Sequence, residues 1–148
     1  MQYDTHTVED LRTLAREFVG AWETKGSATV VTLSGELGAG KTTFVQFVAG
    51  ALGVSETVSS PTFVIEKIYA LEGQRFSRLI HIDAYRMKDE HELEVLGWDE
   101  IVKESDNLIL IEWPERVPNL IPKDAIKVRF DILGDGHRIT IDGGQKVS

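Results

Sequence analysis

The segment that most constrains the fold is the octet Gly35-Glu36-Leu37-Gly38-Ala39-Gly40-Lys41-Thr42, together with the apolar runs on either side of it. It matches the pattern G-x-x-x-x-G-K-[ST] without a mismatch. Residues 28–34 before it form a β-branched apolar run of strand length, and residues 43–52 after it have helical spacing. A strand, a glycine-rich loop and a helix in this order predict a P-loop, which binds a nucleoside triphosphate and magnesium.

The residue types of the octet explain this chemistry. Its glycines allow backbone torsions and a close approach that side chains would block, so backbone amides converge on the phosphates. Lys41 adds a positive charge, and Thr42 supplies a hydroxyl ligand for magnesium. A simple turn between strand and helix would need neither of these two residues. We expect four loop residues to contribute mainly backbone amides: Leu37, Gly38, Ala39 and Gly40.

Length and composition exclude several classes of protein. With 148 residues and 42% hydrophobic content, the chain fits one domain over residues 1–148, with a short flexible tail at about 143–148. No apolar run approaches the roughly 20 residues of a membrane span, and no secretion signal is visible, so we expect a cytoplasmic protein without a membrane partner. The lack of cysteine agrees with a reducing compartment. A net charge of −8 disfavours autonomous nucleic-acid binding.

Patterns elsewhere in the chain predict the remaining elements. Thr7 begins a capping-box-like sequence, which predicts a helix before the first strand. Further strands are predicted within residues 63–71, 75–85, 107–112, 123–133 and 137–141, and one or two short helices within 89–103. The chain is therefore predicted to be an α/β protein of the P-loop NTPase class. Three α/β/α layers would surround a mixed, mainly parallel sheet with antiparallel strands added.

Two acidic residues at strand ends are candidates for holding magnesium or its water shell, as a P-loop enzyme requires. Glu112 follows four consecutive apolar residues, whereas His81 interrupts the strand before Asp83, so the pattern favours Glu112. The structural alternatives are ion pairs of Glu112 with Arg116 and of Asp83 with Arg86.

Two aromatic side chains near these acids have roles that the sequence leaves open. His81 is either a hydrogen-bonded structural residue or a member of a cluster with Asp83 and Tyr85 on one face of the strand. Trp113 either caps the core or shapes a nucleotide or partner surface.

Four motifs occur in a fixed order along the chain. They are residues 35–43 for G-[DE]-L-G-A-G-K-T-T, 60–63 for S-P-T-[FY], 81–86 for H-x-D-x-Y-R and 112–113 for E-W. In order, spacing and total length the chain resembles the bacterial TsaE family, small P-loop ATPases of tRNA threonylcarbamoyladenosine biosynthesis. The resemblance covers nearly the whole chain. Glu36, where many members have Asp, is a mild departure at a position that contributes mostly backbone.

This resemblance implies a slow, partner-activated ATPase with ATP and Mg²⁺ as cofactors. Its partners would be the TsaD and TsaB proteins, which install threonylcarbamoyl on adenosine 37 of tRNAs reading codons that start with A. The tRNA would be reached only indirectly, through that complex.

The resemblance also implies roles for individual residues. Thr42 and Glu112 look like the magnesium ligands, and Lys41, Asp83 and Glu112 look like the catalytic residues. The nucleotide-binding set would further include Thr43 beside the loop, Arg138 near the nucleotide and Thr7 near the adenine.

Two other functions remain compatible with a P-loop. One is a small-molecule kinase, although no compact arginine cluster follows the helical middle to form a lid. The other is a nucleotide-gated binding module in which Asp83 and Trp113 serve an interface and hydrolysis is incidental. The chain has no guanine-reading N-K-x-D or T-K-x-D segment, which favours ATP over GTP.

Overall fold

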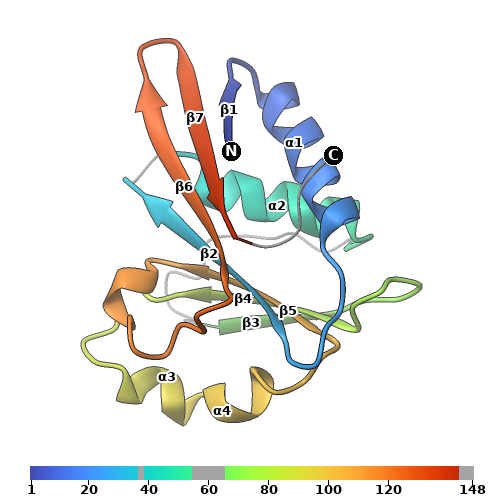
Figure 1. Ribbon diagram of the computed structural model, residues 1–148, viewed down its shortest axis with the longest axis vertical. Coiled ribbons are helices and arrows are strands. Elements are labelled where there is room, and N and C mark those ends of the chain that lie inside the picture. Colours follow the sequence, from blue (N-terminus) through green and yellow to red (C-terminus); the bar gives the residue numbers. More distant parts are fainter. Residues whose placement is uncertain (37–38, 55–65, 144–148) are drawn as a thin grey trace.

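A seven-stranded mixed sheet organises the computed structural model, which describes residues 1–36, 39–54 and 66–143 (Figure 1). The strand order is β1-β7-β6-β2-β5-β4-β3. Strands β6, β2, β5 and β4 are parallel to one another, and antiparallel strands complete both edges of the sheet. The strands are β1 (Gln2–Thr5), β2 (Thr29–Gly35), β3 (Glu66–Ala70), β4 (Arg78–Asp83), β5 (Asn107–Glu112), β6 (Ile126–Leu133) and β7 (Gly136–Asp142).

Helices cover both faces of this sheet (Figure 1). Helices α1 (Val8–Ala21) and α2 (Lys41–Ala51) pack on one face, where Phe18 and Phe44 share a core with Leu108 and Leu110 of β5. The short helices α3 (His91–Val95) and α4 (Trp98–Ile101) lie on the other, against alternate residues of the same strand. The predicted three-layer P-loop NTPase fold is therefore confirmed.

The central strand β5 explains where the site lies. All its residues are buried, as expected for a continuous apolar run covered on both faces. Its parallel neighbours end at the same edge of the sheet, because Glu112 is in register with Leu33 of β2 and with Asp83 of β4. The P-loop and both candidate acids consequently meet at one edge.

The N-terminal region contains one predicted and one unpredicted element. The capping box is confirmed: the Thr7 hydroxyl accepts from the Asp10 amide at 3.1 Å, and the Asp10 carboxylate accepts from the Thr7 amide at 3.2 Å. Strand β1, by contrast, was not predicted. Its short, mostly polar sequence has no apolar alternation, and its place comes from backbone pairing with β7.

Some predictions concern segments that the structure describes only in part. Strand β4 begins at Arg78, later than predicted, and β3 is described from Glu66 onward. The first part of the strand predicted within residues 63–71 lies outside the described residues. The S-P-T-[FY] motif at 60–63 and the tail from 144 lie wholly outside the described residues.

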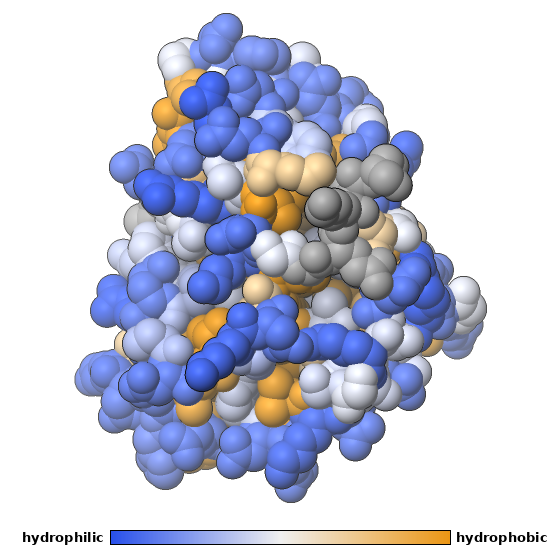
Figure 2. All heavy atoms as spheres, in the orientation of Figure 1, coloured by the Kyte–Doolittle hydropathy of each residue, from blue (hydrophilic) through white to orange (hydrophobic). Residues whose placement is uncertain are grey.

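In the described ranges no helix is both long and apolar enough to cross a membrane. Hydrophilic residues dominate the face drawn in Figure 2, with small hydrophobic areas between them.

Candidate functional site

Helix α2 begins directly at the candidate phosphate loop. Its N-cap is Gly40, which has φ 100°, a left-handed conformation that glycine adopts without steric cost. Gly40 supplies no side-chain cap and the first turn carries no acidic residue, so the N-terminus of α2 is suited to an anion. The Ala39 amide donates to the Glu36 carbonyl at 3.1 Å in a turn. Leu37 and Gly38 lie outside the described residues.

Lys41 is held beneath this loop. Its Nζ donates to the Gly35 carbonyl at 2.6 Å and lies 3.7 Å from the centroid of the Trp113 ring. The side chain is only 4% exposed, and burial lowers the pKa of Lys41, while the charges of Glu112, Glu115 and Asp83 act in the opposite direction. A buried cation of this kind gains strongly from an incoming anion.

Thr42, Glu112 and His81 form a connected polar chain under the start of α2. The Thr42 hydroxyl donates to Glu112 Oε1 at 3.4 Å, and His81 Nε2 lies 2.6 Å from Glu112 Oε2. Glu112 is 3% exposed and His81 is fully buried. These contacts take the place of the ion pair with Arg116, whose guanidinium lies instead 5.8 Å from the Tyr85 ring centroid.

The donor set at Thr42 and Glu112 fits magnesium. A hydroxyl and a carboxylate are hard oxygen donors, and P-loop sites complete the magnesium shell with phosphate oxygens and water. Within the described part of the chain, no group of three or more His, Cys, Asp or Glu side chains could hold a metal ion by itself. The residues therefore fit a metal shared with a bound nucleotide.

Asp83 lies at the end of β4, next to Glu112 in the sheet register. Burial raises the pKa of Asp83 and the Glu112 charge adds to this effect, whereas the hydrogen bond from the Tyr85 amide, at 3.0 Å, lowers it. This carboxylate, half-buried beside a second one, can accept a hydrogen bond from water at the site.

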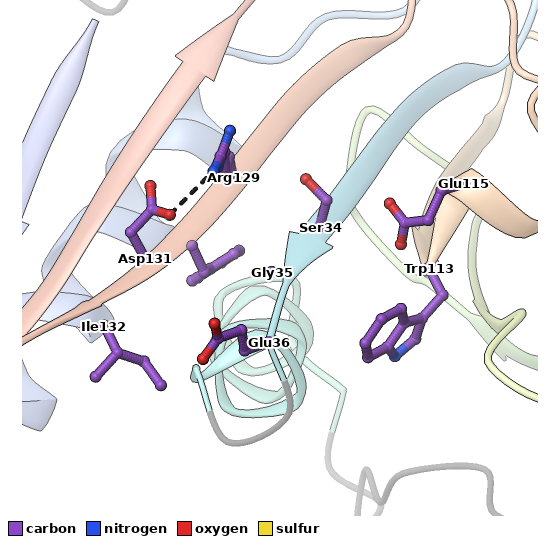
Figure 3. Close-up of a pocket in the computed structure, with 9 residues that line it drawn as sticks. Ser34, Gly35, Glu36, Trp113, Glu115, Arg129, Asp131 and Ile132 are labelled. Atoms are coloured by element: carbon purple, nitrogen blue, oxygen red, sulfur yellow. Dashed lines mark hydrogen bonds and ion pairs between the residues drawn. The ribbon is translucent and has the colours of Figure 1, made fainter.

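Trp113 forms part of an open cleft at this edge of the sheet, with a volume of about 460 Å³ (Figure 3). The residue has φ 59°, its amide donates to the Leu33 carbonyl, and its ring centroid lies 4.9 Å from that of Tyr85. Trp113 also packs, partly buried, against the core on the α3–α4 face, so its position is compatible with both roles that the sequence left open. The cleft is lined by Ser34, Gly35, Glu36, Trp113, Glu115, Arg129, Phe130, Asp131 and Ile132.

The β6 residues of this cleft were missed by the sequence reasoning. Arg129 and Asp131 form an ion pair at 3.2 Å on one face of β6 (Figure 3). Side chains two residues apart on a strand point to the same face, so the sequence of β6 could have predicted that Arg129 and Asp131 share one. The pairing of β6 beside β2, which brings that face to the P-loop, has no local sequence signal.

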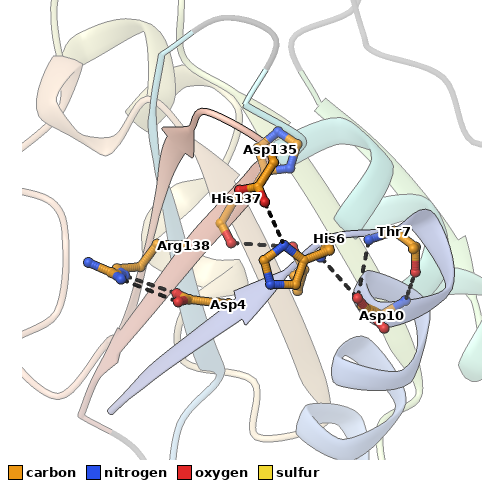
Figure 4. Close-up of polar contacts among 8 residues, drawn as sticks. Asp4, His6, Thr7, Asp10, Asp135, His137 and Arg138 are labelled. Carbon is orange, nitrogen blue, oxygen red and sulfur yellow. Dashed lines mark hydrogen bonds and ion pairs between the residues drawn. The ribbon is translucent and has the colours of Figure 1, made fainter.

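Arg138 lies on β7, and Thr7 lies at the start of α1 (Figure 4). The Arg138 guanidinium makes two hydrogen bonds to the Asp4 carboxylate, at 2.9 and 3.2 Å, across β7 and β1. Thr7 caps α1. Gly40 of the P-loop lies close to the same helix, because a Cβ added to Gly40 would lie 3.8 Å from the Leu11 side chain. The structure thus brings the start of α1 to the P-loop, and it pairs Arg138 with Asp4. Thr43 lies in the first turn of α2.

This fold and this arrangement of side chains define a P-loop NTPase-like protein. A family model described as "Threonylcarbamoyl adenosine biosynthesis protein TsaE" matches residues 5–139, and the chain belongs to this family.

Relatives and a solved structure agree with this assignment. Two proteins named tRNA threonylcarbamoyladenosine biosynthesis protein TsaE are similar to the chain. The one from Borreliella burgdorferi is 36% identical over 77% of this chain and 81% of its own length. The one from Streptomyces coelicolor is 42% identical over 72% and 71%. The crystal structure of Bacillus subtilis YdiB superposes with a TM-score of 0.76 at 29% identity, covering 95% of this chain and 83% of that one.

Proposed function

We propose that this chain binds ATP with Mg²⁺ and hydrolyses it in support of the threonylcarbamoyl modification of adenosine 37 in tRNAs reading codons that start with A. Its partners would be TsaD and TsaB, with tRNA reached only through that complex, in the cytoplasm. The observation that carries the nucleotide chemistry is the contact of the Thr42 hydroxyl with the buried Glu112 carboxylate, beside Lys41. The names of the relatives support the pathway.

The residues of the site would divide the work of hydrolysis. Lys41 and the amides at the start of α2 would hold the phosphates, and Thr42 and Glu112 would hold magnesium. Magnesium, when bound, neutralises charge on the phosphate oxygens. Asp83 would accept a hydrogen bond from the attacking water or from the water shell, and so orient it.

Slow turnover without partners is supported by the contacts of two arginines near the site. Arg129, in the cleft, pairs with Asp131 at 3.2 Å, and the Arg116 guanidinium lies 5.8 Å from the centroid of the Tyr85 ring. An arginine aimed at the phosphates stabilises charge in the transition state of P-loop enzymes and can be supplied in trans. We therefore expect the TsaD–TsaB pair to complete the site.

Steady-state ATP turnover tests this proposal. The purified protein is assayed alone, with TsaD–TsaB, and with TsaD–TsaB plus tRNA, and Glu112→Gln is run in parallel. We expect turnover to rise by an order of magnitude or more with the partners and to fall to background in the variant. Equal rates with and without the partners would contradict partner activation. A phosphorylated metabolite formed from cell extract and labelled ATP would support the small-molecule kinase instead.

A further inference from the structure

His81 is a fully buried histidine whose Nε2 lies 2.6 Å from Glu112 Oε2. Its Nδ1 is also buried, and it has no hydrogen-bond partner among the residues that the structure describes. The two residues lie on adjacent parallel strands, since His81 is in register with Leu110, two residues before Glu112. The imidazole therefore approaches the carboxylate from the side of β4.

The unpaired Nδ1 indicates where the proton is. A buried N–H group without an acceptor is more costly than a buried lone pair without a donor, and a carboxylate can only accept. The arrangement with the fewest unsatisfied groups has the proton on Nε2, which donates it to Glu112 Oε2. That hydrogen bond is charge-assisted, and such bonds are about twice as strong as neutral ones.

This hydrogen bond leaves the other carboxylate oxygen, Oε1, facing the Thr42 hydroxyl. We propose that His81 is a positioning residue for the magnesium site: it fixes the Glu112 carboxylate so that Oε1 and the Thr42 hydroxyl present their oxygens together. The inference rests on the proposed function, because it requires Glu112 to hold the metal.

Packing alone does not account for a histidine here. In the sheet register His81 lies between Leu110 of β5 and Lys67 of β3, and Leu79 precedes it by two residues on the same face of β4. Leu79 and Leu110 are fully buried aliphatic residues. An aliphatic side chain would fill this space without leaving a ring nitrogen unpaired, which carries a free-energy cost in the core. The contribution of the imidazole therefore lies in its contact with Glu112. Groups that orient a metal-ligating carboxylate in this way typically affect metal affinity by roughly 10- to 100-fold.

A matched pair of variants tests the inference. Glutamine and methionine have similar length and volume, but only glutamine keeps an N–H donor near the position of Nε2. Mn²⁺ binding to the protein–ADP complex is measured by electron paramagnetic resonance of free Mn²⁺. We expect His81→Met to weaken Mn²⁺ binding by roughly 10- to 100-fold and His81→Gln to restore most of it. ADP affinity in EDTA should be the same in both variants. His91→Met, at an exposed position on α3, is the control and should bind Mn²⁺ as the wild type does.

Three outcomes would overturn the inference. Equal losses in His81→Met and His81→Gln would mean that packing, not donation, is responsible. Wild-type binding in His81→Met, together with a loss in Glu112→Gln, would overturn the positioning role alone. Wild-type binding in Glu112→Gln would overturn the proposed magnesium site and the inference with it.

A measurement on the unmodified protein covers the case in which His81→Met does not fold. A long-range ¹H–¹⁵N spectrum reports which imidazole nitrogen carries a proton, and His81→Gln identifies the signal. We expect Nε2 of His81 to be protonated, and an unprotonated Nε2 would contradict the proposed hydrogen bond.

Discussion

The Lys41 ammonium lies 3.7 Å from the centroid of the Trp113 indole while donating a hydrogen bond to the Gly35 carbonyl. Such cation–π contacts contribute about 0.5–2 kcal/mol, depending on how far the cation is desolvated. Phosphate groups at the P-loop would compete for the same ammonium. Nucleotide binding and the surroundings of the Trp113 ring are therefore coupled.

Trp113 should report nucleotide binding through its fluorescence. The other two tryptophans, Trp22 and Trp98, are buried in the two cores and lie outside the cleft. We expect ADP to change the intrinsic fluorescence of the wild type, since a bound phosphate removes or weakens the Lys41 contact. The change should be lost in Trp113→Phe and kept in Trp22→Phe. A titration with ADP checks this, and a signal that survives in Trp113→Phe would show that the coupling is absent.

The Thr42 hydroxyl should be needed for magnesium-dependent turnover. Thr42→Val keeps the shape of the side chain but removes the oxygen that contacts Glu112, so we expect hydrolysis to fall by roughly 10- to 100-fold and the Mg²⁺ requirement to rise. Thr42→Ser keeps the hydroxyl and should retain most of the activity. ATP turnover measured against Mg²⁺ concentration checks the pair. Similar losses in both variants would point to helix packing instead.

The sequence predicted those parts of the site that depend on local patterns. The P-loop context, the capping box at Thr7 and the apolar run ending at Glu112 each lie within a few residues, so their spacing alone predicts strand, helix and loop. The location of both acids at one edge of the sheet also follows, because parallel strands end together.

What the sequence could not predict depends on pairing between distant segments. Whether His81 was structural or functional remained open because its partner, Glu112, lies 31 residues away. The pairing of Arg138 with Asp4 depends on β1, a strand too short and polar to be recognised locally. Sheet register of this kind is set by tertiary packing, and local propensity carries little information about it.

Gly35 should tolerate no side chain. A Cβ there would lie 2.4 Å from the Phe130 carbonyl oxygen, and its φ of 139° is rarely adopted by other residues. We expect Gly35→Ala to destabilise the fold by about 1–3 kcal/mol, which lowers Tm by roughly 2–4 °C per kcal/mol. Gly20→Ala in α1 has open space and should instead stabilise by about 0.5–1 kcal/mol. Thermal melts test whether Tm falls in Gly35→Ala and rises in Gly20→Ala. A wild-type Tm in Gly35→Ala would contradict the predicted clash.

Ionisation of the Asp83 carboxyl should destabilise the protein when no nucleotide or metal is bound. Burial is the main cause that raises its pKa above the ordinary value of 3.8, so the folded state favours the protonated carboxyl. The stabilisation from this proton is complete below about pH 3.8 and is lost as the pH rises through the higher pKa of the folded state. At pH 7 the folded protein therefore holds an unfavourable negative charge beside Glu112.

Asp83→Asn removes that charge and keeps an oxygen that can accept from the Tyr85 amide. We expect the variant to have a higher Tm than the wild type at pH 7 in EDTA, with the difference shrinking as the pH is lowered towards 4. Hydrolysis should fall in the same variant, because the carboxylate proposed to orient water is gone; stability is then gained at the expense of activity. Melts over a pH series, with turnover measured alongside, check both parts. A Tm difference independent of pH would show that Asp83 ionises as easily in the folded chain as in the unfolded one.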